Sequence, residues 1–175
     1  MGLIGVHVDD DLITGSQTFF DVVVQQLRKK FVYGKWHTCN QPGENFDHCG
    51  RNIMRRPDGA VVVSQRNYAL GLEPIFLSKD RKKVPSAVIT PKERAELRSG
   101  GPKMAWLVRG TRPDLAFRTA LTQQTVNDPQ LTVQAIIDYN KLVDDAKKHH
   151  QEVVFWPIDL QEAVVLAIEI GRAHV

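Results

Sequence analysis

The chain has 175 residues, which is enough for one ordinary domain or for parts of two. Its apolar content of 42% and its charged content of 25% are ordinary for a globular protein. No apolar stretch is long enough to span a bilayer, and the first residues lack the basic segment of a signal peptide. The two cysteines, Cys39 and Cys49, suit a reducing compartment. We therefore expect an intracellular protein with no membrane partner.

The net charge of +3 is modest, but basic residues gather in short runs. Such a run can meet a polyanion, although one run alone is more often a solvated helix end. The four runs are Arg28-Lys29-Lys30, Arg55-Arg56, Arg81-Lys82-Lys83 and Lys147-Lys148-His149-His150.

The first predicted element is a hairpin with an acidic tip. The segment His7-Val8-Asp9-Asp10 lies between the apolar runs 3–6 and 12–13. A strand that ends in adjacent acids and turns straight back brings two carboxylates together. Like charges side by side are costly unless a cation holds them, and a divalent metal is the simplest such cation. An aspartate-rich turn without a metal is the alternative, and at this point both interpretations stay open.

A helix is predicted over residues 17–31, with Ser16 as its N-cap and apolar residues on one face. Two strands are expected at 46–54 and 60–64, joined by the turn residues Arg56-Pro57-Asp58-Gly59. Ser64 is then expected to cap a second helix. Its apolar face would hold Tyr68, Leu72, Ile75 and Phe76.

A charged, proline-containing linker over residues 78–92 is the best internal boundary. The chain beyond it has a helical pattern, with a helix opened by Pro113 and a break at Asn127-Asp128-Pro129. Another helix runs from Val133 to the last basic run, and strands are predicted at 152–156 and 163–168.

Taken in order, these motifs resemble the reverse transcriptase of copia-type retrotransposon polyproteins. The His7–Asp10 segment with Leu12-Ile13-Thr14-Gly15-Ser16 resembles the family's catalytic hairpin, Tyr-Val-Asp-Asp followed by an apolar strand and Thr-Gly-Ser. The run Thr111-Arg112-Pro113-Asp114 is the most specific single piece. Further similar pieces are 46–53, Val61-Val62-Val63-Ser64-Gln65 with Tyr68-Ala69, Leu97-Arg98-Ser99, Trp106-Leu107 and Asn140-Lys141-Leu142-Val143.

The resemblance implies an α+β fold built as a partial polymerase. Residues 1–54 would be a partial palm with the catalytic hairpin and a helix, and 55–91 a hairpin-helix, thumb-like segment with the linker. Residues 92–168 would be a mainly helical connection toward ribonuclease H. The last segment, 169–175, looks like a translated sequencing adapter, so we expect a non-native tail.

The activity that the resemblance implies is RNA-directed DNA polymerisation by two-metal nucleotidyl transfer. Asp9 and Asp10 would be the catalytic, metal-binding carboxylates for Mg²⁺, with Mn²⁺ as a substitute, and His7 would lie near the primer end. The partners would be an RNA template, a DNA primer and deoxynucleotides, in a cytoplasmic particle or the nucleus. The family's third carboxylate would precede Met1, so we expect the isolated chain to be inactive.

The sequence departs from the family at three places. His7 stands where the family usually has tyrosine. Asp11 stands where an apolar residue normally begins the return strand, and we expect it to point to solvent. Gly100-Gly101-Pro102 replaces a more apolar stretch and is expected to break a helix.

Other functions were weighed against the polymerase. A non-catalytic nucleic-acid-binding remnant needs only the basic runs and the thumb-like helix. A receiver-like signalling domain also binds Mg²⁺ with paired acids after its first strand, but the hairpin signals contradict its alternating βαβ order. A zinc site from His37, Cys39, His48 and Cys49 has none of the usual ligand spacings. Arg112 and Asp114 are expected to form a structural pair at a helix start.

Overall fold

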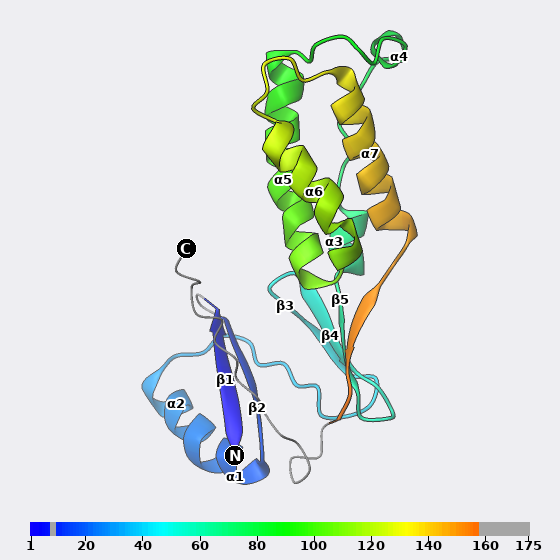
Figure 1. Cartoon of the computed structure of the whole chain (residues 1–175). Coiled ribbons are helices and arrows are strands. Elements are labelled where there is room, and N and C mark those ends of the chain that lie inside the picture. The colour runs from blue at the N-terminus through cyan, green and yellow to red at the C-terminus, as the bar shows by residue number, and fades with distance from the viewer. Residues whose placement is uncertain (8–9, 158–175) are drawn as a thin grey trace, which may run out of the picture.

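The computed structural model describes residues 1–7 and 10–157 (Figure 1). These residues form one two-stranded sheet, one four-stranded sheet and a group of helices. The predicted mixture of helix and strand is therefore confirmed. The strand predicted at 163–168 and the tail at 169–175 lie outside the described residues.

The first part of the chain, residues 2–30, is a hairpin followed by a helix, and we call it the hairpin unit. Its strands pair antiparallel from Gly2↔Gly15 to His7↔Asp10. The Ser16 hydroxyl accepts a hydrogen bond from the Phe19 amide at 3.3 Å, which confirms the predicted N-cap. The elements are β1 (Gly2–His7), β2 (Asp10–Gly15), α1 (Gln17–Phe19), the π-helical turn η1 (Phe20–Val24) and α2 (Gln25–Lys30).

The four-stranded sheet has the order β3-β4-β5-β6, and each neighbouring pair is antiparallel. Its strands are β3 (Asn45–His48), β4 (Arg51–Arg55), β5 (Val61–Ser64) and β6 (Glu152–Phe155). The turn predicted between β4 and β5 is confirmed, because the Gly59 amide donates to the Arg56 carbonyl at 3.0 Å. The β4–β5 pairing crosses the boundary proposed after residue 54, and β6 returns to the same sheet from near the end of the described chain.

The single strand predicted over residues 46–54 is wrong, because the chain turns in its middle. β3 and β4 form a hairpin in which His48 pairs with Arg51. Cys49 and Gly50 connect them with φ values of 49° and 70°. Two consecutive positive φ values are typical of a type I′ turn, and only Gly50 signals this turn in the sequence.

A helical unit, residues 66–148, stands on one end of this sheet (Figure 1). Its core lies between α5, α6 and α7 and includes the fully buried Leu97, Met104, Leu107, Ile136, Leu142 and Val143. The break at residues 127–129 and the helix beyond it are confirmed. The elements are α3 (Arg66–Leu70), α4 (Lys79–Lys82), α5 (Pro91–Gly110), η2 (Pro113–Leu115), α6 (Ala116–Thr125) and α7 (Val133–Lys148).

The helix break predicted at Gly100-Gly101-Pro102 is wrong, since α5 continues through all three residues. A side chain at Gly100 would meet the Tyr139 ring of α7, with its Cβ 2.3 Å from the hydroxyl oxygen. The glycine therefore permits close contact between α5 and α7, and packing holds the helix together across the proline.

The helix predicted after Ser64 is shorter than expected. α3 ends at Leu70, and the chain that follows carries Leu72 and Ile75 into the core as a non-helical segment. The Asn140 side chain replaces helical hydrogen bonds for this segment, because it accepts from the Ile75 amide at 2.7 Å and donates to the Ile75 carbonyl at 2.8 Å. Phe76 is 83% exposed, so it does not share a buried face with Tyr68 as predicted.

The predicted linker over residues 78–92 is packed on the helical unit. Ile89 is buried, and its amide donates to the Leu131 carbonyl at 3.0 Å. Arg81 binds Glu93 through two hydrogen bonds, and Glu93 also completes a capping box with Thr90 at the start of α5. These contacts fix the segment in place. No helix among the described residues is long and apolar enough to cross a membrane.

Candidate functional site

The predicted catalytic residues lie at the end of the β1–β2 hairpin, and the structure describes part of them. His7 and Asp10 form the last backbone pair of the hairpin. Asp9, predicted as a catalytic and metal-binding residue, lies outside the described residues. The backbone of His7 is described, and its predicted place near a primer end stays a prediction. Of the two predicted metal ligands, Asp10 is therefore the one whose carboxylate the structure describes.

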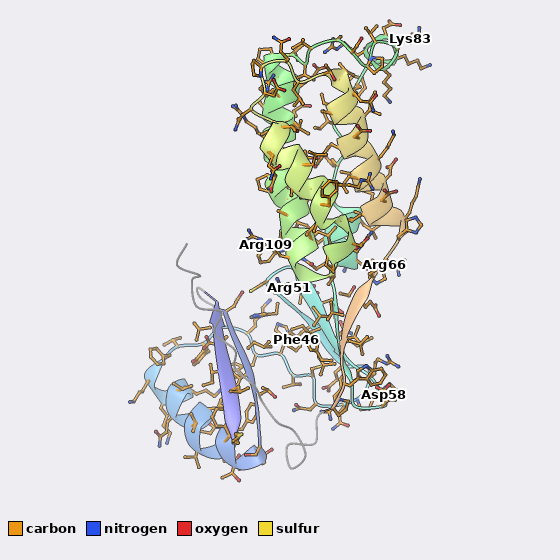
Figure 2. The ribbon with its side chains drawn as sticks, in the orientation of Figure 1. Phe46, Arg51, Asp58, Arg66, Lys83 and Arg109 are labelled. Atoms are coloured by element: carbon orange, nitrogen blue, oxygen red, sulfur yellow. The ribbon has the colours of Figure 1, made fainter. Side chains whose placement is uncertain are left out.

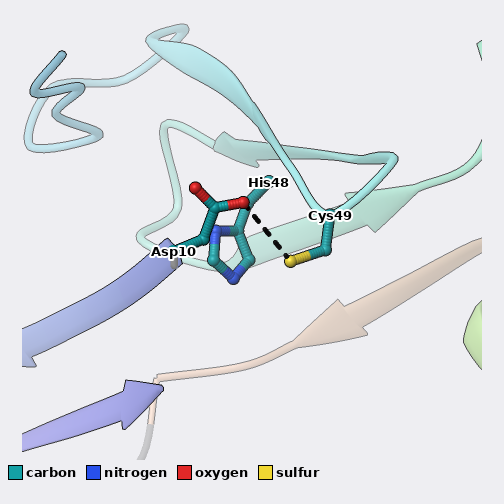
Figure 3. Close-up of side chains that lie close together, drawn as sticks. All are labelled: Asp10, His48 and Cys49. Atoms are coloured by element: carbon teal, nitrogen blue, oxygen red, sulfur yellow. Dashed lines mark hydrogen bonds between the residues drawn. The ribbon is translucent and has the colours of Figure 1, made fainter. Parts of the chain in front are cut away.

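The Asp10 carboxylate meets two side chains from the β3–β4 turn, His48 and Cys49 (Figure 3). One ligand atom of each residue lies within 4.8 Å of the other two. The Cys49 thiol donates to Oδ2 of Asp10 at a sulfur–oxygen distance of 3.9 Å. Asp10 is exposed, and the other two residues are half-buried. A carboxylate, an imidazole and a thiol thus converge from two separate hairpins.

The β3–β4 turn is held from the side of the helical unit. The Trp106 ring of α5 lies beside the turn, with its Nε1 atom 3.5 Å from the position that a Cβ on Gly50 would take. The Arg51 guanidinium lies over the same ring at 4.9 Å from its centre. Glycine and the stacked arginine let the turn approach α5, so the positions of His48 and Cys49 depend on the tertiary fold.

The zinc alternative from His37, Cys39, His48 and Cys49, which the spacing argued against, does not assemble as a group of four. His48 and Cys49 lie with Asp10, whereas the two earlier residues have other contacts. The His37 ring stacks on Phe46 with ring centres 6.3 Å apart, and the Cys39 thiol donates to the Glu44 carbonyl at 3.1 Å. The adjacent potential metal ligands His48 and Cys49 were visible in the sequence. The third residue of the group, Asp10, is 38 positions away from His48 in the chain, so no spacing pattern indicated it.

The donors near Asp10 do not by themselves fit Mg²⁺, which prefers several oxygen ligands in octahedral geometry. Among the described residues, the group supplies one carboxylate with an imidazole nitrogen and a thiol sulfur. Asp10 can provide one of the oxygens that the Mg²⁺ prediction needs, and that prediction stays a prediction.

Asp11 was expected to point to solvent, and this expectation is wrong. Its side chain is half-buried and accepts a hydrogen bond from the Tyr33 hydroxyl at 3.1 Å. Asp11 pairs with Val6 on the strand face opposite to that of Asp10, because side chains alternate along a strand. Burial and this hydrogen bond raise the pKa of the Tyr33 hydroxyl. Asp11 therefore ties the hairpin to the chain after α2 and does not join Asp10.

A cleft of about 430 Å³ separates the hairpin from the four-stranded sheet. Apolar residues of both walls line it, together with two cations, Arg51 from β4 and Arg109 from α5. Figure 2 shows both arginines where the strands meet the base of α5. The remaining lining residues are Gly5, Val6, Leu12, His48, Ile53, Gly110, Val63, Val153 and Phe155.

The basic run at the end of α2 forms part of a second hollow, of about 460 Å³. Arg28, Lys29 and Lys30 are exposed, and the Arg28 guanidinium lies 4.2 Å from the centre of the Trp36 ring. Tyr33 meets Trp36 edge-on, with ring centres 5.0 Å apart. Cations and aromatic faces side by side are the combination that binds single-stranded nucleic acid.

The basic runs at 55–56 and 81–83 are partly neutralised. Arg56 pairs with Asp58 at 2.9 Å, Arg81 pairs with Glu93 at 2.7 Å, and Lys83 pairs with Asp80 at 3.0 Å. Of these, Arg81 is further occupied by the Val88 carbonyl. The run at the end of α2 is thus a better candidate for a polyanion than these two runs.

The expected pair of Arg112 and Asp114 forms an ion pair at 2.7 Å at the start of η2. The arginine side chain is only 4% exposed and also donates to the carbonyls of Asp145, Ala146 and His149. These carbonyls belong to the end of α7, where part of the helical hydrogen bonding is missing, although the Asp145 carbonyl also accepts from the His149 amide at 3.0 Å. Arg112 therefore connects the junction of α5 and η2 to the C-terminal end of α7, a role that the sequence did not indicate.

Comparison with known proteins gives no match: no protein-family model, no curated protein and no solved structure matches the chain at a significant level. All strand pairs among residues 1–7 and 10–157 are antiparallel, so the receiver-like alternative, which needs parallel strands, has no support in this part of the chain.

Proposed function

We propose that this chain is part of an RNA-directed DNA polymerase, a reverse transcriptase of the copia-type retrotransposon polyproteins. The observation that carries the proposal is the β1–β2 hairpin. His7 and Asp10 are its last backbone pair, and Val8 and Asp9 lie between them in the sequence. The acid motif therefore joins the ends of two paired strands, as the Val-Asp-Asp motif of such a polymerase requires.

The order of elements supports the same proposal. A helix follows the acidic hairpin, then come three consecutive antiparallel strands and a short helix, and then the long helices of the helical unit. This order agrees with a partial palm, a thumb-like segment and a connection. The proposal assigns Asp9 and Asp10 to the binding of Mg²⁺, or of Mn²⁺ in its place.

Two cationic surfaces support contact with nucleic acid. Arg51 and Arg109 line the cleft beside the hairpin, and the hollow at the end of α2 combines three cations with aromatic rings. Phosphates bind such cations, and bases stack on such rings. In the proposed polymerase the substrates are an RNA template, a DNA primer and deoxynucleotides.

Primer extension tests the catalytic part of the proposal. Two-metal transfer needs carboxylates that converge on both ions, and the resemblance gives this chain two of the family's three, Asp9 and Asp10. We therefore expect the purified chain to incorporate no nucleotide on a homopolymer RNA template with Mg²⁺ or Mn²⁺. Incorporation that disappears in Asp9→Asn would overturn this expectation of inactivity.

The family assignment has a separate test in the transcript that encodes the chain. We expect an in-frame segment before Met1 that carries an aspartate at the end of a strand-like apolar run. A transcript that reads through into unrelated sequence, with no such strand, would remove the family assignment.

A non-catalytic nucleic-acid-binding role is the second candidate, and the hollow at the end of α2 favours it. Filter binding of an RNA–DNA duplex with a single-stranded template overhang, across a salt series, measures it. We expect retention to weaken as salt rises, and the Lys29→Gln/Lys30→Gln variant to lower the salt slope by roughly two. Lys82→Gln/Lys83→Gln at the end of α4 removes the same charge and is the matched control. Retention that does not depend on salt would contradict this role.

A further inference from the structure

The strongest further feature of the molecule is the group formed by Asp10, His48 and Cys49. We infer that these three residues form a binding site for a borderline transition-metal ion of the Zn²⁺ type. This site goes beyond the proposed polymerase function and does not depend on it.

The distances suit such an ion. Zinc bonds of 2.0–2.3 Å in a tetrahedron put the ligand atoms about 3.3–3.8 Å apart. The Asp10 oxygen and the Cys49 sulfur are already 3.9 Å apart, and no pair in the group exceeds 4.8 Å. Small side-chain rotations close the remaining gap.

The backbone at the β3–β4 turn explains how two neighbouring residues can both be ligands. Adjacent residues in a strand point to opposite faces, so His48 and Cys49 would diverge if the strand continued. Instead, Cys49 has a left-handed φ of 49° and belongs to the turn. Figure 3 shows the imidazole and the sulfur on the same side, toward Asp10. The turn therefore presets two of the three ligands before a metal arrives.

The choice of donors selects the ion. A thiolate and an imidazole favour Zn²⁺ and similar ions, whereas Mg²⁺ prefers oxygen. Three protein ligands leave a fourth coordination position open, as in zinc sites that are not closed structural ones. Because Asp10 is exposed, an ion can reach the group from solvent.

A bound ion would join two parts of the chain that share few other contacts. Asp10 belongs to the hairpin unit, and His48 and Cys49 belong to the four-stranded sheet. A metal on all three donors fixes the hairpin to the sheet beside the cleft that contains Arg51. Zinc binding would also occupy the carboxylate that the polymerase proposal assigns to Mg²⁺.

Cobalt titration of the full reduced chain tests the site, because Co²⁺ replaces zinc and its bond to a thiolate absorbs in the near ultraviolet. We expect this band to saturate at one ion per chain, to disappear when Zn²⁺ is added and to persist in excess Mg²⁺. Cys49→Ser should abolish the band, and the matched control Cys39→Ser should keep it. A band that is missing in the native chain, or that survives Cys49→Ser, would overturn the site.

The other two ligands are tested by affinity. Asp10→Asn and His48→Gln should each weaken zinc binding by about a hundredfold or more, because the loss of a ligand exceeds the 10- to 100-fold cost of losing an outer-shell partner. Asp47→Asn and His37→Gln are the matched controls and should leave the affinity unchanged. Equal losses in ligand and control variants would contradict the assignment.

A measurement on the native chain covers the case in which a variant fails to fold. Zinc should slow alkylation of Cys49 by iodoacetamide and leave the rate at Cys39 unchanged, as mapped by mass spectrometry of the peptides. Equal rates at Cys49 with and without zinc would overturn the site. None of these results depends on primer extension, so failure of the metal site and failure of the polymerase proposal are separate outcomes.

Discussion

The hairpin unit and the helical unit differ in how many of their side chains are buried. In the hairpin unit Val24 is the one buried residue among those whose burial is described, and Leu3 and Val6 are 71% and 72% exposed. In the helical unit the contacts of α5 and α7 bury a continuous core in which Met104 and Ile136 are fully enclosed. The predicted metal-binding aspartates therefore belong to the less buried unit, and the buried apolar core lies in the other.

The position of the candidate site therefore depends more on the contacts that hold the hairpin to the rest of the chain than on packing within the hairpin unit. Elements with few buried apolar contacts open at low free energy. The hairpin is held by its own ladder, by the Asp11–Tyr33 hydrogen bond and by the contact of Asp10 with the β3–β4 turn. Four changes, taken in decreasing order of expected cost, distinguish the two units.

The largest effect is expected in the core of the helical unit. Ile136→Ala removes a fully buried side chain of α7 and should lower the free energy of unfolding by about 2–5 kcal/mol. Ile4→Ala in the half-buried hairpin should cost about 1 kcal/mol. Urea denaturation measures both variants, with hydrogen exchange of α5 and α7 peptides for the first and of β1 and β2 peptides for the second. Similar losses for the two variants would contradict the division between the units.

Arg112→Met tests the connection between the junction of α5 and η2 and the C-terminal end of α7. The substitution removes the arginine donor from the Ala146 and His149 carbonyls, while the Asp145 carbonyl keeps the His149 amide, and we expect a cost of about 1–3 kcal/mol. Arg66→Met replaces an exposed arginine and should stay within about 0.5 kcal/mol. Hydrogen exchange at the last turn of α7 locates the effect. An unchanged exchange rate there would show that the carbonyls do not need Arg112.

Acid should weaken the helical unit through three carboxylates. Hydrogen bonds from Arg81, Arg112 and Arg118 hold the pKa values of Glu93, Asp114 and Asp145 below their ordinary range. A carboxylate whose pKa is lower in the folded state stabilises the fold above its unfolded pKa of about 4. That stability is lost as the pH falls through the lowered values.

The urea midpoint measured from pH 7 down to pH 2 checks this acid effect. We expect it to hold above about pH 5 and to fall below about pH 4. In Arg118→Gln the pKa of Asp145 returns toward its ordinary value, so the fall should be shallower. A midpoint that rises on acidification would contradict the sign.

The smallest effect is expected from Tyr33→Phe. Removing the hydroxyl leaves Asp11 without its hydrogen bond and should cost about 0.5–1.5 kcal/mol, detected as faster exchange of β1 and β2 amides. Tyr68→Phe is the matched change in the helical unit, where the Tyr68 hydroxyl donates to the Lys103 carbonyl at 2.9 Å. Its effect should appear in α3 and α5 alone. If either variant changes exchange in both units equally, the units are not separate.

Local signals in the sequence determined several elements because each depends on neighbouring residues. The two apolar runs around His7–Asp10 predicted the β1–β2 hairpin, Ser16 predicted the start of α1, and the three-to-four spacing after Val133 predicted α7. The turn at residues 56–59 followed from proline and glycine in the same way. These elements do not depend on contacts with distant residues, so the hydrophobic pattern and the turn residues are sufficient to predict them.

Tertiary structure decided the features that depend on contacts between distant residues. Packing of Gly100 against Tyr139 kept α5 continuous, and the place of the β3–β4 turn beside Trp106 accompanies a left-handed conformation at Cys49. The group of Asp10, His48 and Cys49 exists only because two hairpins meet. No spacing rule links residues 10 and 48, since the distance between them is set by the fold and not by the chain.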